Sequence, residues 1–111
     1  MNYYYAIGEI ENWPSKIEML SLLQKENLDF KEGHYSVWYS DEETNISFEE
    51  YGGDLGEPSF QAESTKSLKE FIQELEVISK VLTKNKIINS FEIYNGEEKF
   101  MCTLNEEETK S

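Results

Sequence analysis

The stretch Ser67–Lys84, SLKEFIQELEVISKVLTK, has the clearest periodicity in this chain of 111 residues. At 100° per residue, its large apolar side chains fall on one sector about 120° wide, and polar side chains occupy the opposite side. Ser67 and Glu70 have the spacing of a capping box, in which each side chain accepts a hydrogen bond from the other residue's backbone N–H. The stretch therefore predicts an amphipathic helix that packs on a sheet through Leu68, Phe71, Ile72, Leu75, Ile78 and Leu82.

A second helix and five strands are predicted from the rest of the chain. The helix spans residues 16–27 and follows Pro14, with Ser15 and Glu18 as another capping-box pair. Alternating apolar and aromatic residues indicate strands over residues 2–10, 34–40, 46–51, 87–94 and 97–104.

Glycine-containing stretches mark two connections. Residues 52–62 contain three glycines and a proline, which predicts a long surface loop. Asn95-Gly96 is a strong hairpin signal between the last two strands. A two-residue turn there would place Phe91 opposite Phe100, and a four-residue turn would place Ile93 opposite Phe100.

The order of these elements is strand, helix, strand, strand, helix, strand, strand. Such an order predicts an α+β fold with two helices on one face of a mainly antiparallel sheet. A ferredoxin-like βαββαβ core with one additional strand is the arrangement that we expect first. Residues 1–104 are predicted to form a single domain, and residues 105–111 an acidic tail that frays.

The charge and the cysteine content restrict the partner and the compartment. The formal net charge is −13, and all ten basic residues are lysines, which argues against direct binding to nucleic acid or to an anionic membrane. Cys102 is the only cysteine, so no intramolecular disulfide can form, as suits a reducing compartment. The N-terminal residues lack the pattern of a signal peptide, and no apolar run is long enough to span a membrane. We therefore expect a cytoplasmic protein.

Catalytic and metal-binding patterns are weak. His34 is the only histidine, and neither it nor Cys102 has a catalytic companion at a recognisable spacing. Residues 52–57 lack the spacing of a phosphate-binding loop, and neither they nor residues 41–43 have the ligand spacing of an EF-hand. The sequence therefore predicts a protein that is not an enzyme, with no catalytic residue, cofactor or metal site.

The charge distribution carries the functional hypothesis. No lysine occurs between Glu32 and Glu63, a span that is rich in carboxylates and aromatic residues. Carboxylates can steer a basic partner, and Trp and Tyr often anchor interfaces. The predicted partner-binding residues are Trp38, Asp41, Glu42, Glu43, Glu49, Glu50, Tyr51, Asp54 and Glu57. An equally weighted alternative is that the aromatic residues face the core and the acidic residues only confer solubility.

The leading hypothesis is a non-enzymatic acidic binding protein that neutralises a basic protein, such as an immunity protein that inhibits a nuclease-type bacterial toxin. An alternative is a small secretion or assembly chaperone that acts as a dimer, which the diffuse apolar surface of residues 16–27 would favour. A nucleic-acid mimic and a small-molecule binder are further alternatives. Whether the protein is a monomer or a homodimer stays open.

Overall fold

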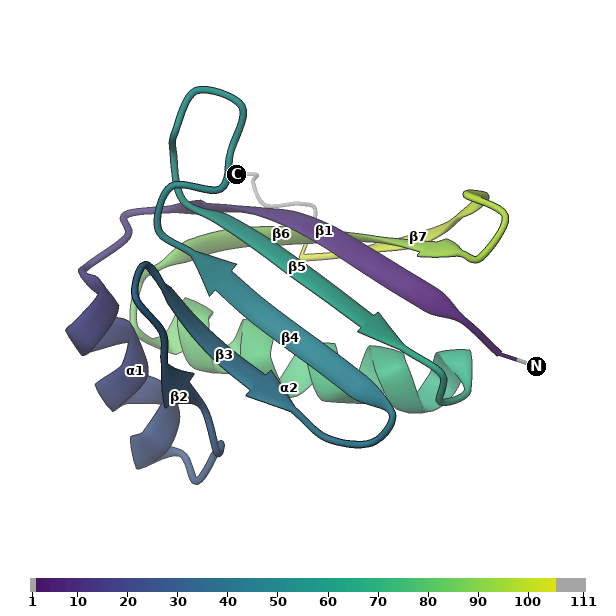
Figure 1. Ribbon diagram of the computed structural model, residues 1–111, viewed down its shortest axis with the longest axis horizontal. Coiled ribbons are helices and arrows are strands. Elements are labelled where there is room, and N and C mark those ends of the chain that lie inside the picture. Colours follow the sequence, from purple (N-terminus) through teal and green to yellow (C-terminus); the bar gives the residue numbers. More distant parts are fainter. Residues whose placement is uncertain (1, 106–111) are drawn as a thin grey trace.

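The computed structural model describes residues 2–105 and places all their strands in one sheet (Figure 1). Except for Asn105, the predicted C-terminal tail lies outside the described residues. The strands of this part of the chain have the order β2-β3-β4-β5-β1-β6-β7, and every neighbouring pair is antiparallel. The elements are β1 (Tyr4–Glu11), α1 (Lys16–Lys25), β2 (Lys31–Glu32), β3 (Ser36–Ser40), β4 (Thr44–Glu49), β5 (Ser59–Ser64), α2 (Leu68–Lys84), β6 (Ile88–Asn95) and β7 (Phe100–Leu104).

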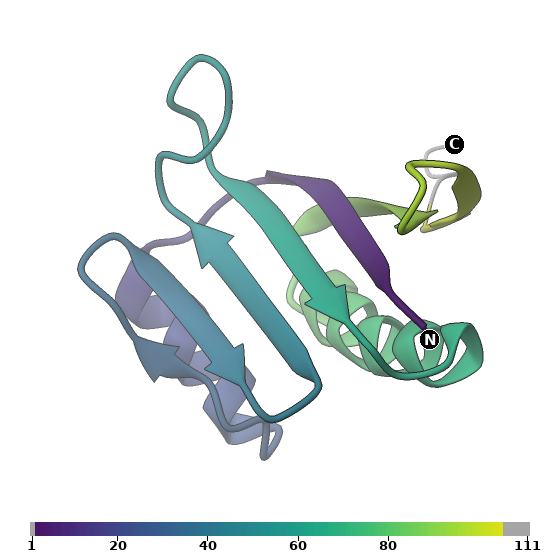
Figure 2. The same cartoon turned by 45° about the vertical axis from the view of Figure 1, so that its right-hand side comes forward.

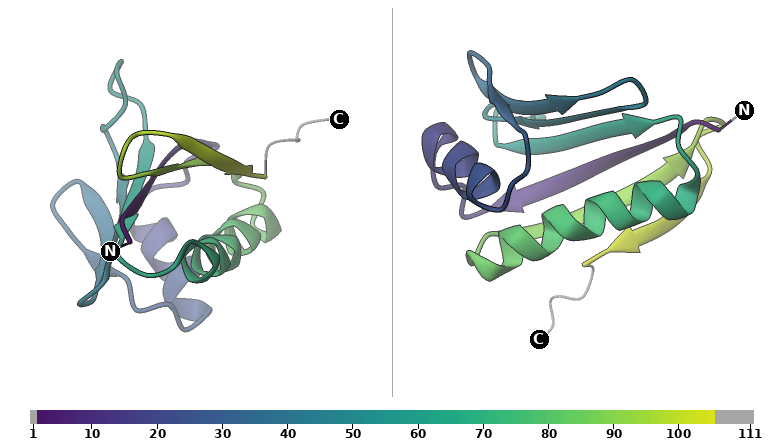
Figure 3. Two further views of the ribbon diagram at one scale, coloured as in Figure 1. Left: turned by 90° about the vertical axis from the view of Figure 1, so that its right-hand side faces the viewer. Right: turned by 90° about the horizontal axis from the view of Figure 1, so that it is seen from below.

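Both helices pack on one face of the sheet, which confirms the predicted α+β fold. α2 contacts β6, whereas α1 contacts β2 and β3, and the two helices touch each other. Figure 3 shows this layered arrangement from the side and from below. In Figure 2 the strands lie in front of both helices, so the opposite face of the sheet is turned toward the viewer. Neither helix of the described residues combines the length and apolar character that a membrane crossing requires.

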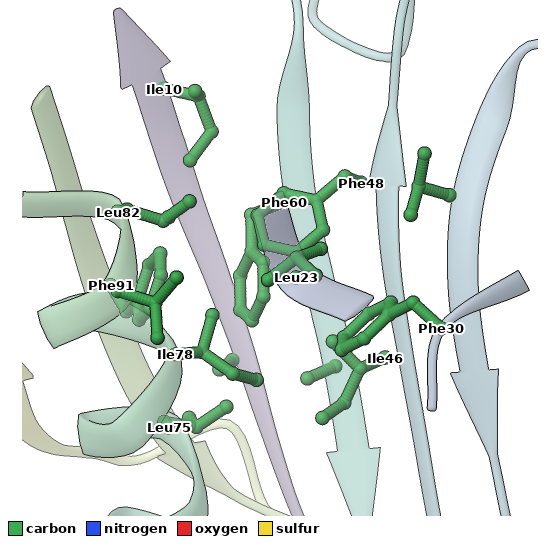
Figure 4. Packing of buried hydrophobic residues seen from close by; sticks show 14 of the residues in the cluster. Ile10, Leu23, Phe30, Ile46, Phe48, Phe60, Leu75, Ile78, Leu82 and Phe91 are labelled. Carbon is green, nitrogen blue, oxygen red and sulfur yellow. The ribbon is translucent and has the colours of Figure 1, made fainter. Parts of the chain in front are cut away.

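The amphipathic helix α2 begins and ends as predicted. The Ser67 hydroxyl accepts from the Glu70 N–H at 3.2 Å, and the Glu70 carboxylate accepts from the Ser67 N–H at 3.3 Å, which completes the capping box. Phe71 and Leu75 are fully buried, whereas Leu68 lies at the edge of the core and is only partly buried. Figure 4 shows side chains of α2 and α1 meeting the aromatic rings of the sheet across the core.

The strand order contains the predicted ferredoxin-like core but builds it from a different hairpin. β1 lies between β6 and β5, and β4 lies beyond β5, which is the order of a βαββαβ core formed by β1, α1, β4, β5, α2 and β6. The predicted core hairpin was residues 34–40 with residues 46–51. In the structure β3 lies outside the core, so three strands (β2, β3 and β7) extend it instead of one.

The strand β5 was missed because its sequence carries a weak apolar signal. Its inward positions are Phe60, Ala62 and Ser64, and only the first is large. Ser64 is buried, and its hydroxyl forms a hydrogen bond with that of Thr44 at 2.8 Å, which compensates for the loss of water. The predicted loop over residues 52–62 is therefore wrong in its last part, because small residues and a paired hydroxyl replace the expected apolar alternation. The short strand β2 is also not among the predicted strands, and it begins at Lys31, before the strand predicted over residues 34–40.

Gly8 allows two aromatic rings to meet across the central strand. It is the cross-strand neighbour of both Phe60 and Phe91, whose rings stack with centroids 4.1 Å apart. A Cβ atom at this position would lie 2.6 Å from Cδ1 of Phe91 and 2.7 Å from the carbonyl oxygen of Ser90. The missing side chain thus leaves the space that this aromatic stack fills.

The β6–β7 hairpin has neither of the two predicted turns. The Asn95 N–H donates to the Lys99 carbonyl at 2.9 Å, and the Glu98 N–H donates to the Asn95 carbonyl at 2.9 Å. The Asn95 side-chain oxygen also accepts from the backbone N–H groups of Glu97 and Lys99. Glu98 has a φ of 66°, as expected for a three-residue loop that closes with a left-handed residue. Phe100 consequently pairs with Tyr94, and a register shift between Ile93 and Tyr94 then pairs Phe91 with Leu104.

Candidate protein-binding face

The face of the sheet opposite the helices is the candidate functional site. Strand register aligns its outward side chains in three rows of five residues, which we call the open face. The middle row is Trp38, Ser47, Gln61, Ile7 and Glu92. The rows on either side are Ser40, Asn45, Glu63, Tyr5 and Tyr94, and Ser36, Glu49, Ser59, Glu9 and Ser90. These fifteen positions, which run from β3 to β6, carry four glutamates and no basic residue. Lys31 of the edge strand β2 is the cross-strand neighbour of Trp38 and extends the middle row by one position.

An aromatic groove of about 510 Å³ runs along the open face. Tyr3, Tyr5 and Ile7 of the β1 segment line one side, and Trp38 of β3 lines the other. Short or polar side chains of β4 and β5 lie between these two sides, including Ser47 and Gln61. The large side chains on the two sides project further from the sheet than the short or polar side chains between them. This difference in side-chain size creates the depression.

The aromatic side of the groove is held by ring contacts and stays accessible. Tyr5 stacks on Tyr94 of β6 with ring centroids 5.3 Å apart, and the ring centroids of Tyr3 and Tyr5 are 6.4 Å apart. Ile7 is 46% exposed and Trp38 is 37% exposed. Large apolar surfaces are thus presented to solvent by strands, which hold side chains more rigidly than loops do.

Glu63 carries a negative charge beside this groove. Its Oε1 accepts from the Tyr3 hydroxyl at 2.9 Å, and its Oε2 accepts from the Asn45 side-chain amide at 3.2 Å. The hydrogen bond to this carboxylate raises the pKa of Tyr3, so the phenol stays a donor. The two donors orient the Glu63 carboxylate, and each of its oxygens retains capacity for another hydrogen bond.

A second depression, of about 600 Å³, continues from the first along β1. Ile7 and Gln61 line both depressions, so the two are adjacent. The second depression lies between β1 and the β4–β5 connection, and we call it the acidic hollow. Its charged lining residues are Glu9, Glu11, Asp54 and Glu57.

The predicted partner-binding residues occupy three places in the structure. Trp38 lies on the open face, pointing away from the helices and from buried Val37, as strand alternation predicts. Asp41, Glu42 and Glu43 form the β3–β4 turn at one end of the hairpin. The others lie at or beyond the far end of β4, about 17 Å away by strand length, and are Glu49, Glu50, Tyr51, Asp54 and Glu57.

Three of these carboxylates are engaged within the chain, and that of Glu49 accepts from the Ser47 hydroxyl. Asp41 accepts from the Tyr39 hydroxyl at 2.5 Å and from the N–H groups of Glu43 and Thr44, each at 2.8 Å. The bond from Tyr39, followed by that from Glu43, lowers the pKa of Asp41 to about 2. Glu57 accepts from the Leu55 N–H at 2.9 Å and thereby shapes the loop. Asp41 and Glu57 therefore have a local structural role, whether or not they also face a partner.

Sequence reasoning missed the β1 side of the site. Tyr3, Tyr5, Ile7 and Glu9 fall within the strand predicted over residues 2–10, but their exposure on the open face was not predicted. The exposure could have been inferred from the number of predicted helices, because two helices on one face of a sheet leave the other face of every strand uncovered. Glu63 was missed because the strand that carries it, β5, was itself partly assigned to a loop.

The residues considered for chemistry are not brought together. His34 precedes β3 near one edge of the sheet, and Cys102 lies in β7 at the other edge. Five strand spacings separate β3 from β7, or about 24 Å. Burial raises the pKa of the Cys102 thiol, which disfavours the nucleophilic thiolate. Within residues 2–105, no three side chains of the metal-binding types form a cluster.

Comparison with known proteins adds no further assignment, since the chain matches no protein-family model, no curated protein and no solved structure.

Proposed function

We propose that the protein is a non-enzymatic binding protein that neutralises a basic protein partner through its open face. The observation that carries this proposal is the combination of four glutamates and an exposed aromatic groove on that face, whose one adjoining base, Lys31 at the sheet edge, is paired with Asp29. An immunity protein that acts in the bacterial cytoplasm against a nuclease-type toxin is the biological role that fits best. A nuclease must itself be basic to bind its substrate, so an acidic inhibitor complements it.

Charge and apolar surface have separate tasks in this proposal. The carboxylates of the open face and the acidic hollow attract a basic surface before contact and raise the association rate. Trp38 and Tyr5 then bury apolar area at the centre of the interface, which slows dissociation. The acids of the β3–β4 turn and of the β4–β5 connection flank the two ends of the groove and extend the negative field along it.

The dimeric chaperone remains the second candidate because apolar side chains are also exposed on the helices. Ile17 of α1 is 57% exposed and Val77 of α2 is 49% exposed. A dimer through the open face is disfavoured, because two copies would bring like charges together. Sedimentation analysis at micromolar concentration distinguishes the candidates: a stable dimer that Ile17→Glu dissociates would favour the chaperone, and a monomer would favour the inhibitor.

The direct experiment reverses the charge of the open face and compares it with a matched control. The face variant carries Glu9→Lys, Glu63→Lys and Glu92→Lys. The control variant carries the same number of reversals at exposed acids away from the face, namely Glu18→Lys, Glu76→Lys and Glu97→Lys. Immobilised wild type, face variant and control variant are each exposed to a cell extract, retained proteins are identified, and the leading one is purified.

Surface plasmon resonance then measures its binding to the three proteins from 50 to 500 mM NaCl. Because both triple variants have the same net charge, a difference between them reports the location of the charge. We expect a basic partner whose association rate falls steeply with salt and falls much further for the face variant than for the control. An equal loss in the two variants, or an acidic partner, would contradict the proposal.

A further inference from the structure

We propose that the aromatic groove receives an arginine side chain of the basic partner, with the guanidinium paired to Glu63. This inference rests on the proposed function and specifies which cationic group the groove selects. It follows from the positions of the side chains in two adjacent rows of the open face. The middle row supplies apolar walls across a low floor, and the neighbouring row supplies a carboxylate beside an aromatic ring.

The middle row fits the aliphatic stem of an arginine. Trp38 and Ile7 stand at its two sides, with Ser47 and Gln61 between them. Neighbouring strands are about 4.8 Å apart, so the two apolar side chains rise from backbones about 14 Å apart. The methylene groups can therefore lie on the floor between two apolar walls, which shields them from water without burying the charge.

The neighbouring row fits the guanidinium group. Glu63 and Tyr5 are direct cross-strand neighbours, and their row lies about 7 Å from the middle row along the strands. The Glu63 carboxylate is oriented by Tyr3 and Asn45, as a planar bidentate pair with a guanidinium requires. The ring of Tyr5 lies beside it, and because Tyr94 covers one face of that ring, a guanidinium would stack on the other face.

Arginine suits this arrangement better than lysine. A guanidinium is planar, forms two parallel hydrogen bonds to a carboxylate and stacks on aromatic rings, whereas an ammonium is a compact and strongly hydrated point charge. The requirement for arginine also distinguishes binding of a different protein from self-association. This chain contains no arginine, so a second copy of it could not provide the occupant.

The test uses two peptides of equal charge, hexa-arginine and hexa-lysine, which share every long-range electrostatic attraction. Isothermal titration calorimetry at 150 mM NaCl measures the affinity of each peptide for the wild type. We expect hexa-arginine to bind about tenfold more tightly, since stacking and bidentate pairing are available only to arginine. Nuclear magnetic resonance should show the Trp38 indole N–H shifting with hexa-arginine, while that of Trp13 stays in place.

Variants locate the preference. Tyr5→Leu and Glu63→Gln should each reduce the ratio of the two affinities to about one, whereas Glu97→Gln on the β6–β7 turn should leave the ratio unchanged. Tyr5→Phe keeps an aromatic face and should retain most of the preference, which guards against a folding defect in Tyr5→Leu. Thermal melts of all variants provide the second check on folding.

The possible outcomes separate this inference from the proposed function. Equal affinity of both peptides for the wild type, with both weakened by the face variant described above, would overturn the arginine assignment and leave the basic partner in place. Binding of both peptides that the face variant does not weaken would overturn both proposals. An arginine preference that persists undiminished in Tyr5→Leu and Glu63→Gln would also overturn the assignment to this groove.

Discussion

Asp41→Ala should destabilise the protein by about 1.5 kcal/mol, because this carboxylate holds the β3–β4 turn. The substitution removes the acceptor for the Glu43 and Thr44 N–H groups and for the Tyr39 hydroxyl. Thr44 is fully buried as a residue, so its N–H loses a partner that water replaces poorly. A lost hydrogen bond of this kind costs about 1–3 kcal/mol, and the partial exposure of Asp41 places the estimate in the lower half of that range. For a domain of this size the melting temperature should fall by roughly 6–12 °C.

The acid dependence of stability provides an independent measure of the same contacts. The folded pKa of Asp41 is depressed to about 2 from 3.8, so its contribution is fully present above pH 3.8 and is lost as the pH falls through 2. Asp41→Asn keeps one acceptor oxygen for the turn amides but cannot ionise. It should cost less than Asp41→Ala, and its stability should fall less between pH 4 and pH 2 than that of the wild type.

Urea denaturation at pH 7 and at intervals down to pH 2 measures these differences. Glu42→Ala is the matched control, since this neighbouring acid is exposed and should change stability by less than about 0.5 kcal/mol. The reasoning would be refuted if Asp41→Ala were as stable as the control. If that variant also associated more slowly with the partner, Asp41 would belong to the interface and not to the turn.

Three further predictions concern the core and the chemistry. Gly8→Ala should cost about 2 kcal/mol and lower the melting temperature by about 10 °C, because the added methyl group meets a phenylalanine ring and a backbone carbonyl; an unchanged melt would show that the stack can move aside. Leu75→Asp should prevent folding by burying an unpaired charge, whereas Lys69→Asp should change stability by less than about 0.5 kcal/mol. Thermal melts followed by circular dichroism compare the two variants, and identical melts would show that the buried face of α2 is wrongly assigned. The double variant with His34→Ala and Cys102→Ala should bind the partner as the wild type does; loss of function with an unchanged melting curve would instead indicate a catalytic role.

The helices and most strands could be predicted because their signals are local. α2 shows both a one-sided apolar pattern and a capping box within its own sequence, and the structure has both. β5 could not be recognised in the same way, since Ala62 and Ser64 are buried by their neighbours and not by their own hydrophobicity. The β6–β7 turn depended on the side chain of Asn95, which binds two backbone N–H groups and so selects a three-residue loop.

The candidate site was only half predictable for a related reason. Trp38 could be placed on the outer face by alternation within one strand, and the structure places it there. Its position opposite Tyr5 and Ile7 depends on which strands are neighbours, a property of the whole sheet. The prediction grouped Asp41 with Glu49 because they are close in sequence. In the structure β4 separates them, so they lie at opposite ends of the β3–β4 hairpin.

The central position of β1 has a consequence for the order in which this protein can fold. Tyr4 pairs with Ser64 on one side and with Asn95 on the other, so both partners of the first strand are synthesised long after it. Contacts between such distant segments raise the contact order and slow folding, because a long chain must close before they form. A nascent chain that ends before β5 can present Trp38 but cannot assemble the groove, since the wall formed by Tyr5 and Ile7 has no strand to pair with. If the open face binds as proposed, a fragment that ends before β5 would lack the complete groove and would not compete for the partner.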